Sequence, residues 1–480
     1  MSNIIFIRPD FGTGMEYVYR QPNPPIGFGY LAAVLSQHGY RVDIIDLTVI
    51  NIARETLVAF IQKKSPLFIG LTSLTAYYNA MKQLALFLKA EISSIPLVVG
   101  GVHASSLPEF ALKECKADFV VIGEGEITIV ELARHLESRN GDPSKIDGIA
   151  YRKGDSVVIT KPRELVKDLD SIPMPAWHKI NPNKYPKNPH GYIMKYNRVA
   201  PVLSTRGCPF SCKYCASCQF WRQTIRYRSP KNVVDEIQYL HDEFGIREIH
   251  FWDDNLTMKR SHIEGICKEI LKRGLQHMAF CAPNGVRVDT LDEPLLRLMK
   301  KAGFYELTFA VESGSRKILK ENGKNINLRT IIKNTLLARK VGILMNSYFM
   351  LGFPGETEAT LEKTIRFSKA LPVHYRTFFI VKPLPGSEIF SSWSKSIDLM
   401  DFNWDALSSY MKANELKLND LDEKFLTKVH KRAHYENNYR LGNFLVILWL
   451  NIKFFHFSQV KFNIERISHM ITGYNTRIFK

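Results

Sequence analysis

The sequence lacks a hydrophobic run long enough to cross a membrane. Its longest apolar stretch, residues 441–450, has half of the ~20 residues that a spanning helix needs. The apolar run at residues 3–7 also has no basic segment before it. We therefore expect neither a transmembrane helix nor a secretory signal, and we predict a cytoplasmic location with at most peripheral membrane contact.

Cysteine is scarce and unevenly distributed. The chain has seven cysteines among 480 residues, an odd number that does not fit a disulfide framework. Four of the seven lie in one short segment, at Cys208, Cys212, Cys215 and Cys218. This clustering predicts a reducing compartment and a metal site.

The sequence also lacks low-complexity segments, obvious repeats and a concentrated basic patch. Its 45% hydrophobic and 23% charged residues exclude collagen-like, coiled-coil and largely disordered proteins. The net charge of +18 predicts a surface that attracts polyanions, anionic lipid or acidic small molecules. No nucleic-acid-binding module is evident, so we expect no nucleic-acid partner.

Short apolar runs alternate with amphipathic segments between residues 4 and 137. The runs predict buried strands at residues 4–7, 42–45, 68–71, 97–99 and 119–122. The segments between them predict helices at residues 29–37, 52–63, 76–91 and 126–137. Strands that alternate with helices form parallel sheets with right-handed crossovers, so we expect an α/β, Rossmann-like first domain.

Glycines gather where these strands are expected to end. They are Gly70, Gly100, Gly101, Gly123 and Gly125. Glycine is also common in tight turns, so any one of them could be there for the turn alone. Because open sheets bind ligands at the carboxyl ends of their strands, five glycines at one edge favour a ligand cleft.

The alternation of strands and helices returns after residue 202. Strands are predicted near residues 249–252, 280, 307–311, 347–351 and 376–381. Helices such as residues 232–244 and 261–272 separate them. This order indicates a complete or partial (β/α) barrel.

Two other segments separate or follow these α/β regions. Residues 146–160 read as a hairpin around Gly154–Asp155, and residues 165–197 as a linker rich in Pro, Asn and Lys. The part beyond Phe402 reads as helical and basic. The domains that we predict are a Rossmann-like domain at 1–150, hairpin and linker at 151–197, a barrel at 198–400 and a basic helical region at 401–480.

The carboxyl end has two possible uses. Residues 441–457 mix aromatic side chains such as Trp449 and Phe454 with flanking basic residues, a composition found in interfacial segments. Such stretches are also common in helices that pack on a domain and expose a charged face. We favour a helical cover packed on the barrel.

The central segment Thr205-Arg206-Gly207-Cys208-Pro209-Phe210-Ser211-Cys212-Lys213-Tyr214-Cys215 has a C-x3-C-x2-C spacing directly after a predicted strand. Three thiolates on one loop suit zinc or an iron-sulfur cluster. With Cys218 they could form a four-cysteine zinc site. Three ligands alone would leave one iron of a [4Fe-4S] cluster open, and the spacing favours this second interpretation.

The segment resembles the signature of radical S-adenosylmethionine (SAM) enzymes, C-x3-C-x-aromatic-C, with Tyr214 at the aromatic position. The resemblance continues along the barrel at residues 251–255, 284–289, 311–315, 352–357 and 383–387. It implies a radical SAM barrel in which Cys208, Cys212 and Cys215 hold three irons and SAM chelates the fourth. The methionine amine and carboxylate of SAM supply that chelation.

Upstream segments narrow the resemblance. Residues 24–35, 100–104 and 123–126 are similar to the cobalamin-binding domain of cobalamin-dependent radical SAM enzymes. That group includes anaerobic magnesium-protoporphyrin ester cyclases, hopanoid-modifying enzymes and methyltransferases. The Asp-x-His-x-x-Gly motif, which supplies a histidine ligand to cobalt in other cobalamin domains, is absent. The resemblance therefore implies cobalamin bound without a histidine ligand.

The resemblance also assigns cofactor contacts residue by residue. Tyr214 would line the adenine of SAM, and Glu312, followed by Ser313, would accept hydrogen bonds from the ribose unless it only caps a helix. Asp253 and Asp254 replace a Gly-Gly-Glu run and would contact either the SAM amino end or the substrate. Cobalamin would be bound by Gly70, Thr72, Ser73, Gly100, Gly101, His103, Gly123, Glu124 and Gly125. His103 would lie at the cobalamin periphery, although a turn-stabilising role fits it almost as well.

These assignments imply an enzyme that cleaves SAM and functionalises an unactivated carbon, with methyl transfer as the favoured outcome. Radical oxidation, cyclisation or rearrangement of a tetrapyrrole, lipid or antibiotic precursor is the alternative. A non-catalytic iron-sulfur or cobalamin sensor is the alternative from a different class. The expected partners are a small-molecule substrate and an electron donor such as flavodoxin or ferredoxin.

Overall fold

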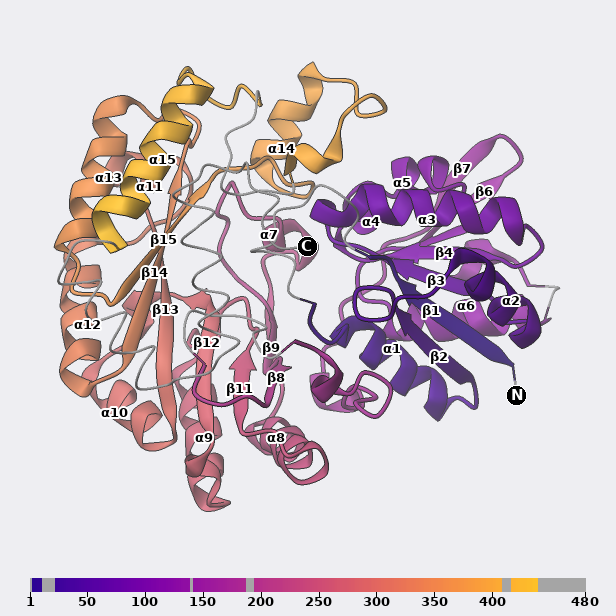
Figure 1. The fold of residues 1–480 in the computed structure, drawn as a ribbon, viewed down its shortest axis with the longest axis horizontal. Helices are drawn as coiled ribbons and strands as arrows, with labels where there is room; N and C mark the ends of the chain where they lie inside the picture. Colours follow the sequence, from indigo (N-terminus) through magenta and orange to yellow (C-terminus); the bar gives the residue numbers. More distant parts are fainter. Residues whose placement is uncertain (1, 11–21, 139–140, 187–193, 408–415, 439–480) are drawn as a thin grey trace.

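The computed structural model describes residues 2–10, 22–138, 141–186, 194–407 and 416–438. Within them the chain forms one seven-stranded sheet, one six-stranded sheet and a small two-stranded sheet. Figure 1 shows the two large sheets side by side, each with its own helices. In the described carboxyl-terminal part of the chain, Trp404 and Leu407 pack in the core of the first sheet, and residues 423–438 contact the last strand of the second.

The first sheet has the strand order β2-β1-β3-β4-β5-β6-β7. Its strands are β1 (Asn3–Arg8), β2 (Arg41–Asp46), β3 (Ile69–Thr72), β4 (Leu97–Gly100), β5 (Phe119–Val121), β6 (Ile149–Lys153) and β7 (Ser156–Ile159). The first five are parallel, and the β6–β7 hairpin pairs antiparallel with β5. The five parallel strands match the predicted apolar runs, and the predicted hairpin extends their sheet.

Helices cover both faces of this sheet. They are α1 (Ile26–Gln37), α2 (Arg54–Lys64), α3 (Tyr78–Glu91), α4 (Val102–Ser106), α5 (Pro108–Glu114) and α6 (Glu126–Ser138). The α1 and α6 side chains share a core with Ile4 and Phe6, whereas those of α2, α3 and α5 pack with Ile5 and Ile7. This division follows from the period of two along a strand. The short helices α4 and α5 were not predicted.

The second sheet is parallel throughout, with the order β15-β14-β13-β12-β11-β8. Its strands are β8 (Val199–Val202), β11 (Glu248–Phe251), β12 (Ala279–Val286), β13 (Phe304–Glu312), β14 (Leu344–Leu351) and β15 (Tyr375–Ile380). Within the described residues β8 and β15 are its two edges and do not pair, so the barrel is partial. The expectation of a partial (β/α) barrel after a Rossmann-like sheet is confirmed.

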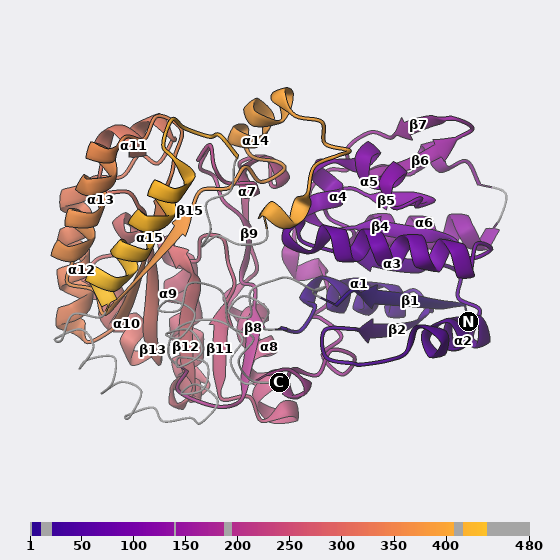
Figure 2. The same ribbon diagram turned by 45° about the horizontal axis from the view of Figure 1, so that its top comes forward.

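The barrel helices lie on the outer face of the curved sheet (Figure 2). They include α8 (Pro230–Phe244), α9 (Arg260–Lys272), α10 (Glu293–Lys301), α11 (Arg316–Glu321), α12 (Leu328–Val341) and α13 (Glu358–Ala370). The predicted helices at 232–244 and 261–272 correspond to α8 and α9. Between β8 and α8, the strands β9 (Thr205–Gly207) and β10 (Ile225–Tyr227) pair antiparallel and frame the cysteine segment with α7 (Ser217–Phe220).

Helix α15 (Glu423–Asn438) closes the β15 edge of the barrel. Asn438 accepts a hydrogen bond from the Arg376 backbone N–H (3.1 Å) and donates one to the Arg376 carbonyl (2.7 Å). His430 contacts the Phe378 carbonyl at 2.9 Å. Side chains of α15 thus occupy backbone groups that a neighbouring strand would otherwise pair. Residues 441–457, for which two uses were considered, lie outside the described residues.

None of the helices in the described part of the chain is long and apolar enough to span a membrane.

Candidate functional site

A cavity of about 1140 Å³ lies between the carboxyl edges of the two large sheets. The first sheet contributes the carboxyl ends of β3, β4 and β5 and the loops that follow them, including Thr72, Gly100 and Gly123. The barrel contributes side chains that alternate along its strands, such as Tyr348 and Met350 of β14. Parallel sheets bind ligands at this edge, so both halves of the molecule direct their ligand-binding ends into one space.

Most predicted cobalamin contacts line this cavity. They are Gly70, Thr72, Ser73, Gly100, Gly101, Gly123, Glu124 and Gly125. Further lining residues that were not predicted as site residues are Leu74, Tyr77, Phe220, Trp221, Trp252 and Phe379. Five of these six are aromatic, and their contribution depends on contacts between distant segments, which the sequence pattern does not reveal.

Gly101 and Gly100 on this edge differ in whether the fold itself excludes a side chain at their position. Gly101 has φ +92°, and a Cβ there would lie 2.5 Å from the Thr72 hydroxyl, so a side chain is excluded by both backbone and space. At Gly100 a Cβ would meet only ordinary contacts, the nearest at 3.6 Å from the Val121 carbonyl. Gly100 is therefore not required by the fold, and its lack of a side chain leaves room in the cavity.

The predicted cobalamin contact His103 does not line the cavity. Its side chain is fully buried, stacks on Tyr78 with ring centroids 4.0 Å apart and lies edge-on to Trp404 at 4.6 Å. Burial lowers the pKa of His103 to about 3, so the ring is neutral. The structure places His103 in an aromatic core, and the predicted contact with the periphery of cobalamin stays a prediction.

Glu124 lines the cavity but has strong partners within the protein. It accepts hydrogen bonds from Arg206 and Arg226, each at 2.7 Å, and Arg206 also contacts Glu126 at 2.6 Å. These guanidinium groups lower the pKa of Glu124 despite its burial. Because Arg206 lies in β9, two residues before Cys208, this network ties the first sheet to the cysteine segment. Glu124 therefore joins the two halves of the molecule while lining the cavity, and its contact with cobalamin stays a prediction.

The three cysteines of the predicted triad lie on one loop between β9 and α7. The Cys215 backbone N–H donates to the Cys212 carbonyl at 3.0 Å, and the Lys213 N–H donates to the Asn322 carbonyl at 3.1 Å. Cys208 Sγ lies 3.9 Å from the Asn255 amide nitrogen. A backbone contact therefore ties the loop to the residue that follows α11, and the Asn255 side chain contacts the loop from the segment that follows β11.

The thiols of the loop differ in the direction in which their pKa values are shifted. Burial raises the pKa of Cys208 and of Cys212, whereas a hydrogen bond from the Cys218 thiol lowers the pKa of Cys215 to about 7. Cys218 also contacts the Cys212 carbonyl at 3.5 Å. Cys218 is thus placed to support the loop as a hydrogen-bond donor.

The spacing of the sulfurs bears on the choice between zinc and a cluster. Thiolates on one tetrahedral zinc ion lie about 3.8 Å apart, because Zn–S bonds are about 2.3 Å long. Among the residues that the structure describes, the cysteines of this loop do not form a group with ligand atoms all within 4.8 Å of one another. The assignment of a cluster therefore rests on the C-x3-C-x2-C spacing of the sequence and not on a preformed site for one ion.

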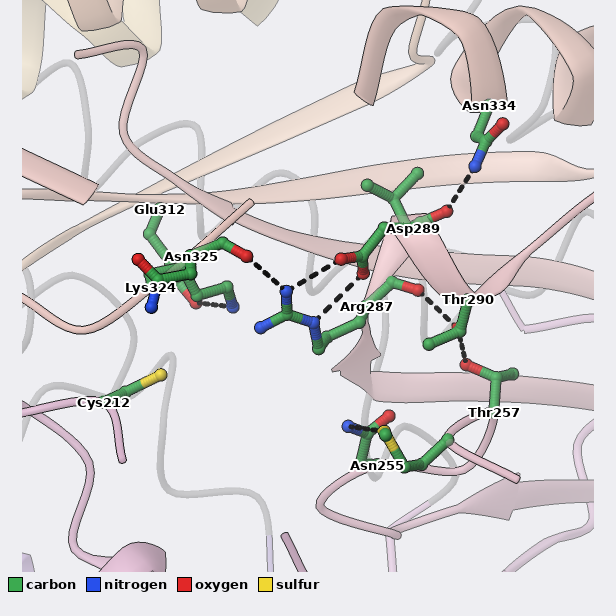
Figure 3. Close-up of polar contacts among 12 residues, drawn as sticks. Cys212, Asn255, Thr257, Arg287, Asp289, Thr290, Glu312, Lys324, Asn325 and Asn334 are labelled. Carbon is green, nitrogen blue, oxygen red and sulfur yellow. Dashed lines mark hydrogen bonds and ion pairs between the residues drawn. The ribbon is translucent and has the colours of Figure 1, made fainter. Parts of the chain in front are cut away.

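Arg287 and Asn255 lie beside the loop (Figure 3), and each has a buried polar atom without a hydrogen bond in the described part of the chain. Arg287 contacts Asp289 and the Asn325 carbonyl and lies 3.9 Å from the Phe210 ring, yet its Nη1 has no hydrogen bond. Asn255 Oδ1 is likewise buried and unpaired. Such atoms fit a site that holds a polar group against the thiols, as a cluster with SAM requires. Both residues lie in segments that carried the family resemblance, but neither was predicted individually.

The backbone of Glu312 is strained in a way that is typical of functional sites. Its φ is +70°, a strained value for a residue with a side chain, and its carboxylate pairs with Lys324 at 3.2 Å. Lys324 also acts on Cys212, whose pKa it lowers against the effect of burial. Figure 3 shows Glu312 and Lys324 on the Cys212 side of the loop. The neighbouring Ser313 bonds to Thr364 at 2.9 Å and is fully buried.

Tyr214 and the two aspartates face different surroundings. Tyr214 packs edge-on against Phe353 at 5.3 Å, and burial raises its pKa well above the usual value. Asp253 Oδ1 accepts hydrogen bonds from the Ser204 N–H and from the Ser204 and Thr205 hydroxyls, so Asp253 fixes the β8–β9 turn. Asp254 lines the cavity and accepts a hydrogen bond from Ser217. Asp253 Oδ2 is buried without a hydrogen bond, and Asp254 is the aspartate of this pair that lines the cavity, so the ligand contact of each stays a prediction.

Two family models match the chain where these features lie. The B12 binding domain model matches residues 17–133, and the radical SAM superfamily model matches residues 202–368. The first range contains the glycine-rich edge, and the second contains the cysteine loop and the strands around it.

Relatives and solved structures extend the match over most of the chain. An uncharacterised methyltransferase of Pyrococcus horikoshii is 30% identical over 437 residues, covering 90% of this chain and 92% of the relative. The anaerobic magnesium-protoporphyrin IX monomethyl ester cyclase of Cereibacter sphaeroides is 28% identical, covering 87% and 68%. The structure of the radical SAM methyltransferase TsrM from Kitasatospora setae aligns with a TM-score of 0.69 at 18% identity, covering 82% and 75%, which supports the fold.

Proposed function

This chain belongs to the cobalamin-dependent radical SAM enzymes, and from this premise we propose that it methylates an unactivated carbon of a small, largely apolar substrate. The cofactors are a [4Fe-4S] cluster, SAM and cobalamin. The proposal rests on one observation: the cavity of about 1140 Å³ is bounded by the glycine-rich edge, by the residues that follow Cys215 and by aromatic side chains of the barrel.

We assign Cys208, Cys212 and Cys215 to the cluster, with Asn255 and Arg287 as its polar neighbours. When bound, the cluster and SAM supply the radical that activates the substrate carbon, and cobalamin supplies the methyl group. The chain's own residues hold these groups, orient them and exclude water. The loop after Cys215 supports this assignment, because Ala216 and Ser217 line the cavity directly.

We assign the glycine-rich edge, with Thr72 and Ser73, to cobalamin. The backbone and small side chains there leave space that larger residues would fill, which suits a bulky preformed cofactor. Among the described residues that line the cavity there is no histidine. This supports binding without an imidazole on cobalt.

Charges on the cavity wall support an apolar substrate. Arg206 pairs with Glu124 and Glu126, and Arg8 pairs with Asp46 at 2.6 Å. Asp254 is the remaining acid of the lining and is bonded to Ser217. A wall whose basic groups are already paired offers little to an anionic substrate, whereas Trp252, Tyr348 and Phe379 offer apolar surface.

Radical cyclisation is the second candidate. The cyclase of Cereibacter sphaeroides acts, by its name, on a magnesium-protoporphyrin ester, and the match to it extends over most of this chain. An extended aromatic wall would suit a flat tetrapyrrole as well as another apolar molecule.

We further propose that the electron reaches the cluster from a small acidic protein such as flavodoxin or ferredoxin. The net charge of +18 supports electrostatic attraction of such a donor. A reducing cytoplasmic location is in keeping with seven free cysteines and an oxygen-sensitive cluster.

The decisive experiment is product analysis under anaerobic conditions. Reconstituted enzyme is incubated with reductant, cobalamin, SAM labelled at its methyl group, and apolar tetrapyrrole, lipid or antibiotic precursors. Methyl transfer predicts a product that carries the label. An unlabelled product one oxidation level higher would favour cyclisation, and failure to cleave SAM with a full cluster and cobalamin would favour a sensor.

A further inference from the structure

The amino-terminal part of the barrel strands holds a second group of ionisable side chains, which are not among the residues that line the cavity. Glu248 and His250 of β11 and Cys281 of β12 place one ligand atom each within 4.8 Å of the others, and all three are buried. Neighbouring residues such as Phe280 and Phe304 pack under the helices in the main core. Because side chains alternate along strands, the group lies on the opposite, interior face of the sheet.

Strand register brings a further carboxylate to this group. His250 pairs with Cys281, and Cys281 pairs with Glu306 of β13. Phe280 pairs with Phe304, so Tyr305 is an extra residue in β13 and marks a bulge. Bulges redirect side chains. The Tyr305 hydroxyl donates to Glu248 at 2.6 Å, while Glu306 remains beside Cys281.

The hydrogen bonds of the group are unevenly distributed. Glu248 Oε2 accepts from the Lys195 and Tyr196 backbone N–H groups, each at 2.7 Å, and its Oε1 lies 2.9 Å from His250 Nε2. In contrast, both carboxylate oxygens of Glu306 and Nδ1 of His250 are buried without a hydrogen bond. An interior carboxylate without a partner is costly unless a proton or a cation compensates it.

We propose that Glu248, His250 and Cys281 bind a zinc-class divalent cation, with Glu306 as the fourth ligand. Carboxylate, imidazole and thiolate are the three side-chain ligand types of zinc. Glu306 lies outside the 4.8 Å group, so its coordination requires a change in its side-chain torsions. Binding releases the Cys281 thiol proton and the Glu306 carboxyl proton, moves the His250 ring proton from Nε2 to Nδ1, and replaces the contact between Glu248 and His250 by two bonds to the metal.

The metal site would be structural and not catalytic. Lys195 and Tyr196 belong to the segment that leads into β8, and their contacts with Glu248 close the end of the barrel that lies away from the cavity. A cation there would join β11, β12 and β13 to this segment. The competing arrangement is a metal-free polar plug, in which burial raises the pKa of Glu306 to about 8 and a proton neutralises it.

The experiment counts zinc and iron in the full-length protein, because zinc can also occupy an empty cysteine loop. The wild type, purified anaerobically with zinc and reconstituted, should hold one zinc per chain besides its iron. Changing Cys208, Cys212 and Cys215 together to Ala should remove the iron and leave the zinc. Cys281→Ser or His250→Gln should remove the zinc and leave the iron. Cys267→Ser, at another buried cysteine in α9, is the matched control and should retain both.

Milder variants keep the test valid if Cys281→Ser does not fold. Tyr305→Phe removes the hydrogen bond to Glu248 and should weaken zinc binding by about 10- to 100-fold. Cobalt(II) added to the cluster-free triple variant should produce a thiolate-to-cobalt charge-transfer band that Glu306→Gln weakens. A wild type that binds no zinc at stoichiometric concentration, or zinc that leaves with the cysteine loop, would overturn the proposal in favour of the protonated plug. Either result would leave the proposed methyl transfer untouched.

Discussion

The two large sheets meet at one cavity but contribute different kinds of groups to it. The first sheet offers glycines and small side chains at the ends of β3, β4 and β5. The barrel offers thiols, amides and ionisable groups around its cysteine loop. A bulky preformed cofactor is held by shape, whereas a metal cluster is held by ligating atoms, so each half has the composition that its cofactor requires.

The largest effect is expected on the barrel side. Cys208→Ala, Cys212→Ala or Cys215→Ala each removes one cluster ligand and should reduce SAM cleavage to background. Iron content and the absorption of the cluster should fall with it. Cys218→Ala is the matched control, because Cys218 donates to Cys212 and Cys215 without belonging to the triad. Loss of the cluster in this control, with the fold retained, would instead point to a four-cysteine site.

The next effect tests the glycine side. Gly100→Val places a branched side chain in the cavity, where a Cβ meets no close neighbour in the protein. The variant should fold and keep its cluster while cobalamin binding weakens by at least about tenfold, as measured by titration with hydroxocobalamin. Gly100→Ala is the smaller matched change and should weaken binding less. Gly101→Val is a poorer probe because its φ of +92° makes misfolding the expected outcome.

A third prediction concerns the link between the two sheets. Glu124→Gln leaves Arg226 buried without its carboxylate partner and should lower the free energy of unfolding by about 3 kcal/mol. The pKa of Glu124 is lowered in the folded protein, so its contribution is present above the unfolded pKa and is lost as pH falls through the folded pKa. Urea unfolding across acidic pH should therefore show a smaller acid-induced loss in the variant than in the wild type. Equal pH slopes in both proteins would contradict the assigned role of this carboxylate.

The same contrast explains what the sequence could predict. The parallel strands follow from local periodicity, and their positions agree with the predictions, whereas the cysteine triad follows from its spacing and from the family resemblance and stays a prediction as a ligand set. The contacts that Glu124 and His103 make within the protein do not follow from the sequence around each residue. Glu124 pairs with Arg206, which is 82 residues away, and His103 packs against Trp404 from the carboxyl-terminal part of the chain. Contacts of this kind are decided by tertiary packing. The sequence segments Gly-Glu-Gly at residues 123–125 and Gly-Gly-Val-His at residues 100–103 would read the same whether their side chains faced a ligand or the core.

The smallest effect concerns how each sheet ends. The first sheet ends in the β6–β7 hairpin, whose backbone pairs with β5, whereas the barrel ends at β15 under side chains of α15. Asn438→Ala removes the two hydrogen bonds to Arg376 and leaves a buried backbone N–H and C=O unpaired. The free energy of unfolding should fall by about 1–3 kcal/mol in urea unfolding. Tyr435→Ala on the same helix, at a side chain that is 68% exposed, is the control and should change the free energy of unfolding little.

Because an uncovered edge strand can pair with another chain, Asn438→Ala should also aggregate more readily than the control on warming. If both variants behave alike, the side chains of α15 do not replace a neighbouring strand, and the barrel edge is stabilised only by the apolar contacts of that helix.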